Sequence, residues 1–176
     1  MSAPRVVGLD LSLASTGIAV GHWTFSIKPG DRRDLARLEY LRDAVLAYVI
    51  DNSPDLVVVE GPSYGSARGA QAGHHERAGL WWLVRMAITG GAGGWPLAVV
   101  PPATLKLYAT GKGTADKPAM AVAAYKRLGI EGVSDDEVDA AWLRAAGMDH
   151  LGHPLAVMPA AQRAALDKVT WPEVTR

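Results

Sequence analysis

Four acidic residues stand where a site for divalent cations would need them. Asp10 ends an apolar run, VVGLD, and Glu60 closes a second one in DLVVVEG. Asp136 and Asp139 lie three residues apart in SDDEVDAAW, at the start of an expected helix. Burial of an unpaired carboxylate is costly, so acids at the ends of hydrophobic strands need a compensating partner. Carboxylate oxygens suit hard cations such as Mg²⁺, and a metal pair can stabilise both oxygens of an in-line phosphoryl displacement.

The acidic helix start also has a purely structural interpretation. Ser134 would cap the helix, Glu137 would complete a capping box, and Asp135 would favour the helix dipole. That interpretation leaves Asp139 unexplained, because the first turn has ended before it. Helix positions three apart are neighbours, with Cβ atoms roughly 5–6 Å apart, so Asp136 and Asp139 can face one ion.

The two strand acids are each ambiguous when taken alone. Asp10 could cap the turn that follows it, and Glu60 could pair with a neighbouring Arg. Their joint occurrence on two expected strands, followed by the acidic helix, favours one convergent cation site.

The elements that would position these acids alternate along the chain. Three N-terminal strands followed by alternating helices and strands predict an α/β fold with a mixed sheet and helices on its faces. The apolar spacing in the first helix predicts a buried stripe of Leu35, Leu38, Val45 and Tyr48 or Val49. Strands are expected at 5–10, 16–20, 22–27, 55–60 and 96–102, and helices at 31–51, 70–89, 103–109, 117–128, 134–148 and 159–168.

Composition sets further bounds on the protein. The 176 residues suit one domain with a real core, and we see no internal repeat. Lys plus Arg equals Asp plus Glu, 18 each, which argues against a long basic tail. Cysteine is absent, which excludes disulfides, cysteine-ligated zinc and iron–sulfur clusters. There is no long apolar run and no signal-peptide pattern, so we expect a cytoplasmic protein, bacterial or in a phage-infected host, without a membrane partner.

Four segments in this order resemble the RuvC-like Holliday junction resolvases of the RNase H-like superfamily. They are GLDLSLASTGIAV at 8–20, VVVEGPSYG at 57–65, KLYATGKGTADK at 106–117 and SDDEVDAAW at 134–142. The resemblance covers about residues 5–150, with 151–176 as a C-terminal extension of a single nuclease domain over 1–176. Leu11 and Ser12 follow the first acid where Pro-Gly is common in cellular members, which is closer in character to divergent phage-type members.

The resemblance implies a structure-selective endonuclease that resolves four-way DNA junctions by paired phosphodiester hydrolysis as a homodimer. Its fold would be an RNase H-like mixed five-stranded sheet with helices on both faces. Asp10, Glu60, Asp136 and Asp139 would be the ligands of two Mg²⁺ ions, for which Mn²⁺ can substitute. Lys106 and Lys117 fall where the family carries two lysines near the scissile phosphate, so they join the four acids as catalytic candidates.

Candidate DNA contacts follow the second acid and the lysine segment. Tyr64 is the best candidate to stack on an unpaired base at a branch point. Arg68, Arg77 and Lys112 could form a phosphate-binding rim, although each could equally be a solvated charge. Of the adjacent Trp81 and Trp82, one is expected in the core and the other in a dimer interface, and core positions for both stay open.

Other functions stay open at this point. A related nuclease of the superfamily could act on RNA, as the pre-ribosomal RNA processing enzymes do. A non-catalytic junction-binding module would require the loss of at least one acidic ligand, and all four are present. A sugar-kinase or actin-like ATPase would need two such domains, for which this chain is too short.

Overall fold

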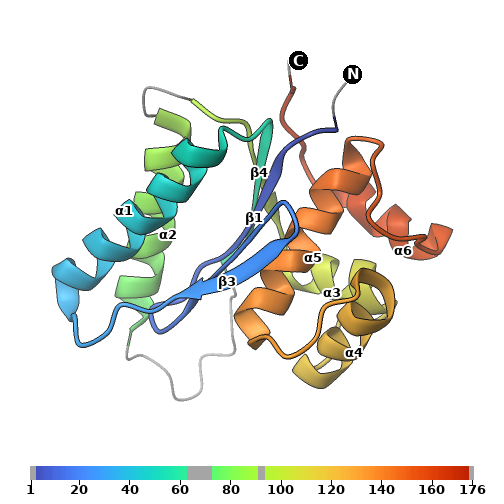
Figure 1. Cartoon of the computed structure of the whole chain (residues 1–176), viewed down its shortest axis with the longest axis horizontal. Helices are drawn as coiled ribbons and strands as arrows, with labels where there is room; N and C mark the ends of the chain where they lie inside the picture. Colours follow the sequence, from blue (N-terminus) through green and yellow to red (C-terminus); the bar gives the residue numbers. More distant parts are fainter. Residues whose placement is uncertain (1–2, 63–72, 91–93, 175–176) are drawn as a thin grey trace.

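A five-stranded sheet forms the centre of the protein (Figure 1). The computed structural model describes residues 3–62, 73–90 and 94–174. Strand order across the sheet is β3-β2-β1-β4-β5, with β1 antiparallel to β2, β2 antiparallel to β3, and β4 and β5 parallel to β1. The strands are β1 (Val6–Asp10), β2 (Thr16–Val20), β3 (Trp23–Ile27), β4 (Leu56–Glu60) and β5 (Leu97–Val100).

Helices cover both faces of this sheet, as predicted. The first two helices pack together on one face, and the others lie on the opposite face, where α5 crosses β1 and β2 (Figure 1). The sheet order and the helix layers confirm the predicted mixed five-stranded α/β architecture. The helices are α1 (Asp34–Asn52), α2 (His74–Gly90), α3 (Pro102–Thr110), α4 (Lys117–Leu128), α5 (Asp135–His150) and α6 (Ala160–Arg163), followed by the 3-10 helix η1 (Ala164–Lys168).

Alternate residues of the central strands enter two separate cores. Val7 and Leu9 of β1 pack toward α1 and α2, whereas Val6 packs toward α5. The same alternation holds in β4, where Val57 belongs to the α1/α2 core and Val58 to the α5 core. Both faces are therefore apolar, which explains why these strands read as continuous hydrophobic runs.

The buried stripe of α1 differs from the predicted one. Leu41, Val45 and Val49 are buried, whereas Leu35 is 62% exposed. Leu35 lies in the first turn of α1, and the first buried residue of the helix is Leu41. Helical spacing located the stripe, but the sequence did not reveal that the first turn of α1 would stay exposed.

The C-terminal residues join the α5 side of the molecule. Met158, Ala165, Leu166 and Val169 are buried in the same core as α3, α4 and α5. Across the described residues, no helix has the length and apolar character needed to cross a membrane.

Candidate active site

Asp10 and Glu60 end two neighbouring parallel strands at the same level. Leu9 pairs with Val59 in the register of β1 and β4, so the next residues along, Asp10 and Glu60, lie side by side. Adjacent strands lie roughly 4.8 Å apart. Since even-numbered residues of both strands face α5, the two carboxyl groups point to the same face of the sheet.

Two glycines bring α5 against the sheet beside these acids. Gly17 pairs with Asp10 across β1 and β2, and a Cβ at Gly17 would overlap the Asp136 carbonyl group. Gly8 lies under the middle of the helix, where a Cβ would be 2.6 Å from the Arg144 nitrogen. The backbone of α5 therefore packs directly against β1 and β2. This packing places Asp136 over the Asp10–Gly17 pair of those two strands.

The predicted capping box starts α5. The Ser134 hydroxyl oxygen accepts a hydrogen bond from the Glu137 backbone N–H at 3.4 Å, and the same hydroxyl lies 2.9 Å from the Glu137 carboxylate. Glu137 is thus occupied by the cap. Within the part of the chain that the structure describes, Asp136 and Asp139 make no comparable contact, and both are half-buried.

The acids are close enough to shift one another's pKa. The pKa of Asp10 is raised from 3.8 to about 8, mainly by burial and then by the charges of Glu60, Asp139 and Asp136. Burial, followed by the charge of Asp139, raises the pKa of Glu60 to about 7. The pKa of Asp139 is raised to about 6, again with burial as the main cause. Repulsion among carboxylates from three separate elements shows that the fold gathers them at one place.

The donor chemistry of this cluster fits a divalent cation. No hydrogen bond or ion pair within the described residues engages the carboxyl groups of Asp10, Glu60 or Asp139. These half-buried acids therefore have no hydrogen-bond or ion-pair partner among the described residues, and a hard cation with oxygen ligands would supply one. Among the residues that the structure describes, no three His, Asp or Glu side chains are already grouped at metal-binding spacing. The cluster is therefore open, and the acids would have to draw together around an ion.

Both predicted lysines lie beside the acidic cluster. Lys106 of α3 is half-buried, and its charge lowers the pKa of Glu60 and of Asp139. Lys117 begins α4, and its ammonium forms a 2.9 Å ion pair with Asp135. Lys117 also lowers the pKa of Asp10 and Asp139. Lys117 is thus held at the rim by an acid outside the predicted ligand set, while Lys106 stands nearer Glu60.

Of the four predicted DNA-contacting residues, the structure describes only Arg77 and Lys112. Tyr64 and Arg68 lie outside the described residues. Arg77 is exposed in the first turn of α2, and Lys112 is exposed in the connection from α3 to α4. The Thr110 hydroxyl bonds with both the N–H and the carbonyl of Lys112, which fixes the backbone that carries this side chain.

Sequence reasoning missed the residues that hold the cluster in place. Trp81 is expected from sequence only in the core or in a dimer interface, yet its indole N–H donates to the Glu60 carbonyl oxygen at 3.0 Å. Trp82 is 55% exposed and stacks edge-on against Trp81. The role of Gly17 could have been suspected, because a Gly inside a strand pattern often marks a close backbone approach.

A five-stranded mixed sheet of this order with helices on both faces is an RNase H-like fold. No protein-family model matches the sequence, and no curated protein matches it. Solved structures match well. RuvC from Thermus thermophilus superposes with a TM-score of 0.67 at 19% identity, covering 88% of this chain and 99% of that one.

Two further solved structures agree with that match. The same Thermus thermophilus protein in complex with Holliday junction substrate gives a TM-score of 0.67 over 89% of this chain and 99% of that one, again at 19% identity. The yeast mitochondrial Holliday junction resolvase Ydc2 gives 0.60 at 15% identity, over 94% of this chain and 81% of that one. The protein therefore has a RuvC-like fold.

Proposed function

We propose that this protein is a metal-dependent endonuclease that cuts branched DNA, four-way junctions above all, by phosphodiester hydrolysis. The observation that carries the proposal is the gathering of Asp10, Glu60, Asp136 and Asp139, from three elements, on one face of the sheet edge. The solved structures of the same fold include resolvases of Holliday junctions, one of them bound to its junction, which supports the choice of substrate.

The four acids would hold two Mg²⁺ ions, with Mn²⁺ as a substitute. When bound, such a pair supplies charge stabilisation to both oxygens of an in-line displacement at phosphorus. Asp10 and Glu60, fixed on adjacent strands, provide the rigid part of the ligand set. Asp136 and Asp139 provide the part carried by α5, whose position depends on Gly17.

The lysines would act on the phosphate rather than on the metal. Lys106 lies close enough to Glu60 and Asp139 to affect both, so its ammonium can offset the charge that builds up on the cleaved phosphate. Lys117 is tied to Asp135 in an exposed pair, a kind of interaction that is weak in water, so it can exchange that partner for a phosphate.

DNA would be bound along the rim of the same edge. Lys112 and Arg77 are exposed and could contribute to it, and Tyr64 and Arg68 belong to the segment that directly follows Glu60 in sequence. A junction has four arms, and paired cuts need two active sites, so we propose that the protein works as a homodimer.

The face of α2 that carries Trp82 supports this proposal. Trp82 is 55% and Met86 65% exposed, and the two are four residues apart on one helix face. Trp82→Ala should shift the mass measured by light scattering from dimer toward monomer. An unchanged dimer would remove this face from the proposed interface.

A substrate panel tests the proposed function. Purified protein with Mg²⁺ would be given four-way, three-way, flap and linear DNA, together with a structured RNA. We expect cleavage to be fastest on the four-way junction. Preferential cleavage of the RNA would favour an RNA-processing nuclease. Tight junction binding without any cleavage would identify a non-catalytic junction-binding module.

A further inference from the structure

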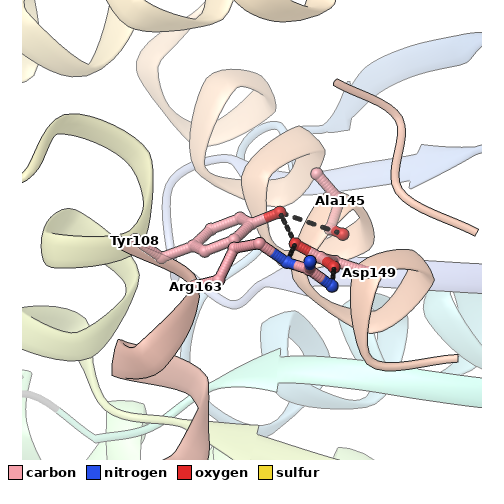
Figure 2. A network of polar contacts seen from close by, with 4 residues as sticks. All are labelled: Tyr108, Ala145, Asp149 and Arg163. Carbon is pink, nitrogen blue, oxygen red and sulfur yellow. Dashed lines mark hydrogen bonds and ion pairs between the residues drawn. The ribbon is translucent and has the colours of Figure 1, made fainter. Parts of the chain in front are cut away.

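A buried polar network lies at the C-terminal end of α5, whereas the acidic cluster lies at its N-terminal end. Figure 2 shows the residues of this network. The Asp149 side chain is only 1% exposed. Its carboxylate accepts two hydrogen bonds from the Arg163 guanidinium, one from Nε at 3.1 Å and one from Nη2 at 2.6 Å. It also accepts the Tyr108 hydroxyl at 3.1 Å. Three elements, α3, α5 and α6, therefore meet at one carboxylate.

Every part of this network has a defined partner. The Tyr108 ring is buried edge-on against Trp142, and its hydroxyl is also 3.5 Å from the Ala145 carbonyl oxygen. Burial, followed by the charge of Asp149, raises the pKa of Tyr108, so the hydroxyl stays protonated and donates. Arg163 approaches from the solvent side with a 52% exposed side chain. The guanidinium thus lies between the buried Asp149 carboxylate and solvent.

The C-terminal segment makes further contacts with α3. Gly111, which caps the end of α3 with a φ of +83°, lies directly beside the Gln162 side chain. The segment itself is fixed by Trp171, whose ring stacks on His150 at 4.2 Å and whose indole N–H donates to the Leu166 carbonyl at 3.2 Å. Residues 160–171 therefore form a segment that packs against α3.

The helix that this segment packs against carries Lys106. Residues two positions apart on an α-helix differ by roughly 200° around its axis, so Lys106 and Tyr108 point to opposite sides of α3. The Tyr108 side is held by Asp149 and Arg163, and the Lys106 side faces Glu60 and Asp139. An isolated helix of nine residues is not stable in water, so the orientation of α3 depends on what packs against it.

We propose that Arg163 is a positioning residue, which acts through Asp149 and Tyr108 to hold Lys106 in place at the active site. The proposal rests on the proposed function, because Lys106 is assigned there to the cleaved phosphate. It also assigns the C-terminal extension a task in catalysis, although the extension contributes no residue to the acidic cluster.

A double-mutant cycle tests the coupling between Arg163 and Lys106. Single-turnover cleavage at saturating DNA would be measured for Arg163→Met and Tyr108→Phe, each in the wild-type and the Lys106→Ala background. In the wild-type background we expect Arg163→Met to slow cleavage about tenfold or more, because a small misplacement of a catalytic group is costly. In the Lys106→Ala background the same change should cost less than about twofold.

Arg127→Met is the matched control. Arg127 also ties the C-terminal segment to the core, through the Val157 carbonyl and the Met158 sulfur, both at 3.4 Å, but from α4. It should leave the cleavage rate within about twofold of wild type. An equal loss from Arg163→Met in both Lys106 backgrounds, or an equal loss from Arg127→Met, would overturn the proposal.

Hydrogen exchange separates this proposal from the proposed function. Arg163→Met, or the milder Tyr108→Phe if the first variant fails to fold, should raise amide exchange in α3 while α1 stays protected. Unchanged exchange in α3 would overturn the positioning role whether or not the protein cleaves DNA. Wild-type protein that cuts none of the branched substrates would overturn the proposed function, and the exchange result would still decide whether Arg163 holds α3.

Discussion

Asp10 combines burial with three neighbouring negative charges, so its ionisation opposes folding when no cation is bound. Its pKa in the folded protein is about 8, against 3.8 for an ordinary Asp. One pKa unit corresponds to about 1.4 kcal/mol. In EDTA at pH 8, Asp10→Asn should therefore raise the free energy of unfolding by about 1–3 kcal/mol, which thermal or urea unfolding would measure. Asp43→Asn, at an exposed Asp beside Arg42, is the control and should bring no gain.

The pH dependence of this gain has a defined sign. Between pH 3.8 and about 8, the folded protein holds a proton on Asp10 that the unfolded chain has lost. This residue's contribution to stability is thus greatest at low pH and falls as pH rises through 8. The advantage of Asp10→Asn should shrink as pH is lowered toward 4, and saturating Mg²⁺ should stabilise the wild type only. A stabilisation that is independent of pH would contradict the repulsion that we assign to the cluster.

The contact between α5 and the β1–β2 pair positions Asp136 and Asp139, half of the proposed ligand set. A Cβ at Gly17 would overlap the Asp136 carbonyl and lie 3.0 Å from the Glu137 nitrogen. Gly17→Ala should push the start of α5 away from Asp10, lower stability by about 1–3 kcal/mol and reduce cleavage. Gly79→Ala is the control, since its Cβ would meet only the end of Leu38 at 3.5 Å and alanine favours the helix. Wild-type cleavage by Gly17→Ala would show that α5 need not rest on the sheet.

Most elements were predictable from sequence, because each carries its own local signal. The β-branched run before Glu60 and the capping box at Ser134 fixed β4 and the start of α5 within a residue or two. The Asp149 network was not predictable, since it joins residues from α3, α5 and α6 whose partners are distant in the chain. A lone Asp in an apolar helix gives no sign of whether it faces water or an arginine. The gathering of the acids was predictable only because strand ends meet at one edge of a sheet.

The protein has a formal net charge of zero, yet its charged residues are unevenly distributed. Acids gather at the sheet edge beside Lys117, and Lys112 and Arg77 are exposed. Counterions are released by local basic groups, so junction binding should weaken steeply with salt despite a net charge of zero. Lys112→Ala should weaken binding to every substrate and reduce the salt slope by about one unit in a fluorescence titration.

Lys126→Ala provides the comparison for that measurement. Lys126 lies in the last turn of α4, about 14 Å along the helix axis from Lys117, and should leave the salt slope unchanged. Equal effects of the two variants would mean that the basic rim near the acidic cluster is not the DNA contact.

The measurement that tests the account most directly is cleavage of a four-way junction by the wild type and by Asp139→Asn, with binding measured in parallel. The wild type should cut with Mg²⁺ or Mn²⁺ and not in excess EDTA, while Ca²⁺ should permit binding without cleavage, since it takes more oxygen ligands in a looser geometry. Asp139→Asn should bind the junction and fail to cut it, because the neutral amide lacks the negative charge that the metal site needs. Cleavage by Asp139→Asn at the wild-type rate, or robust cleavage in EDTA, would contradict the assignment of the acidic cluster as the catalytic site.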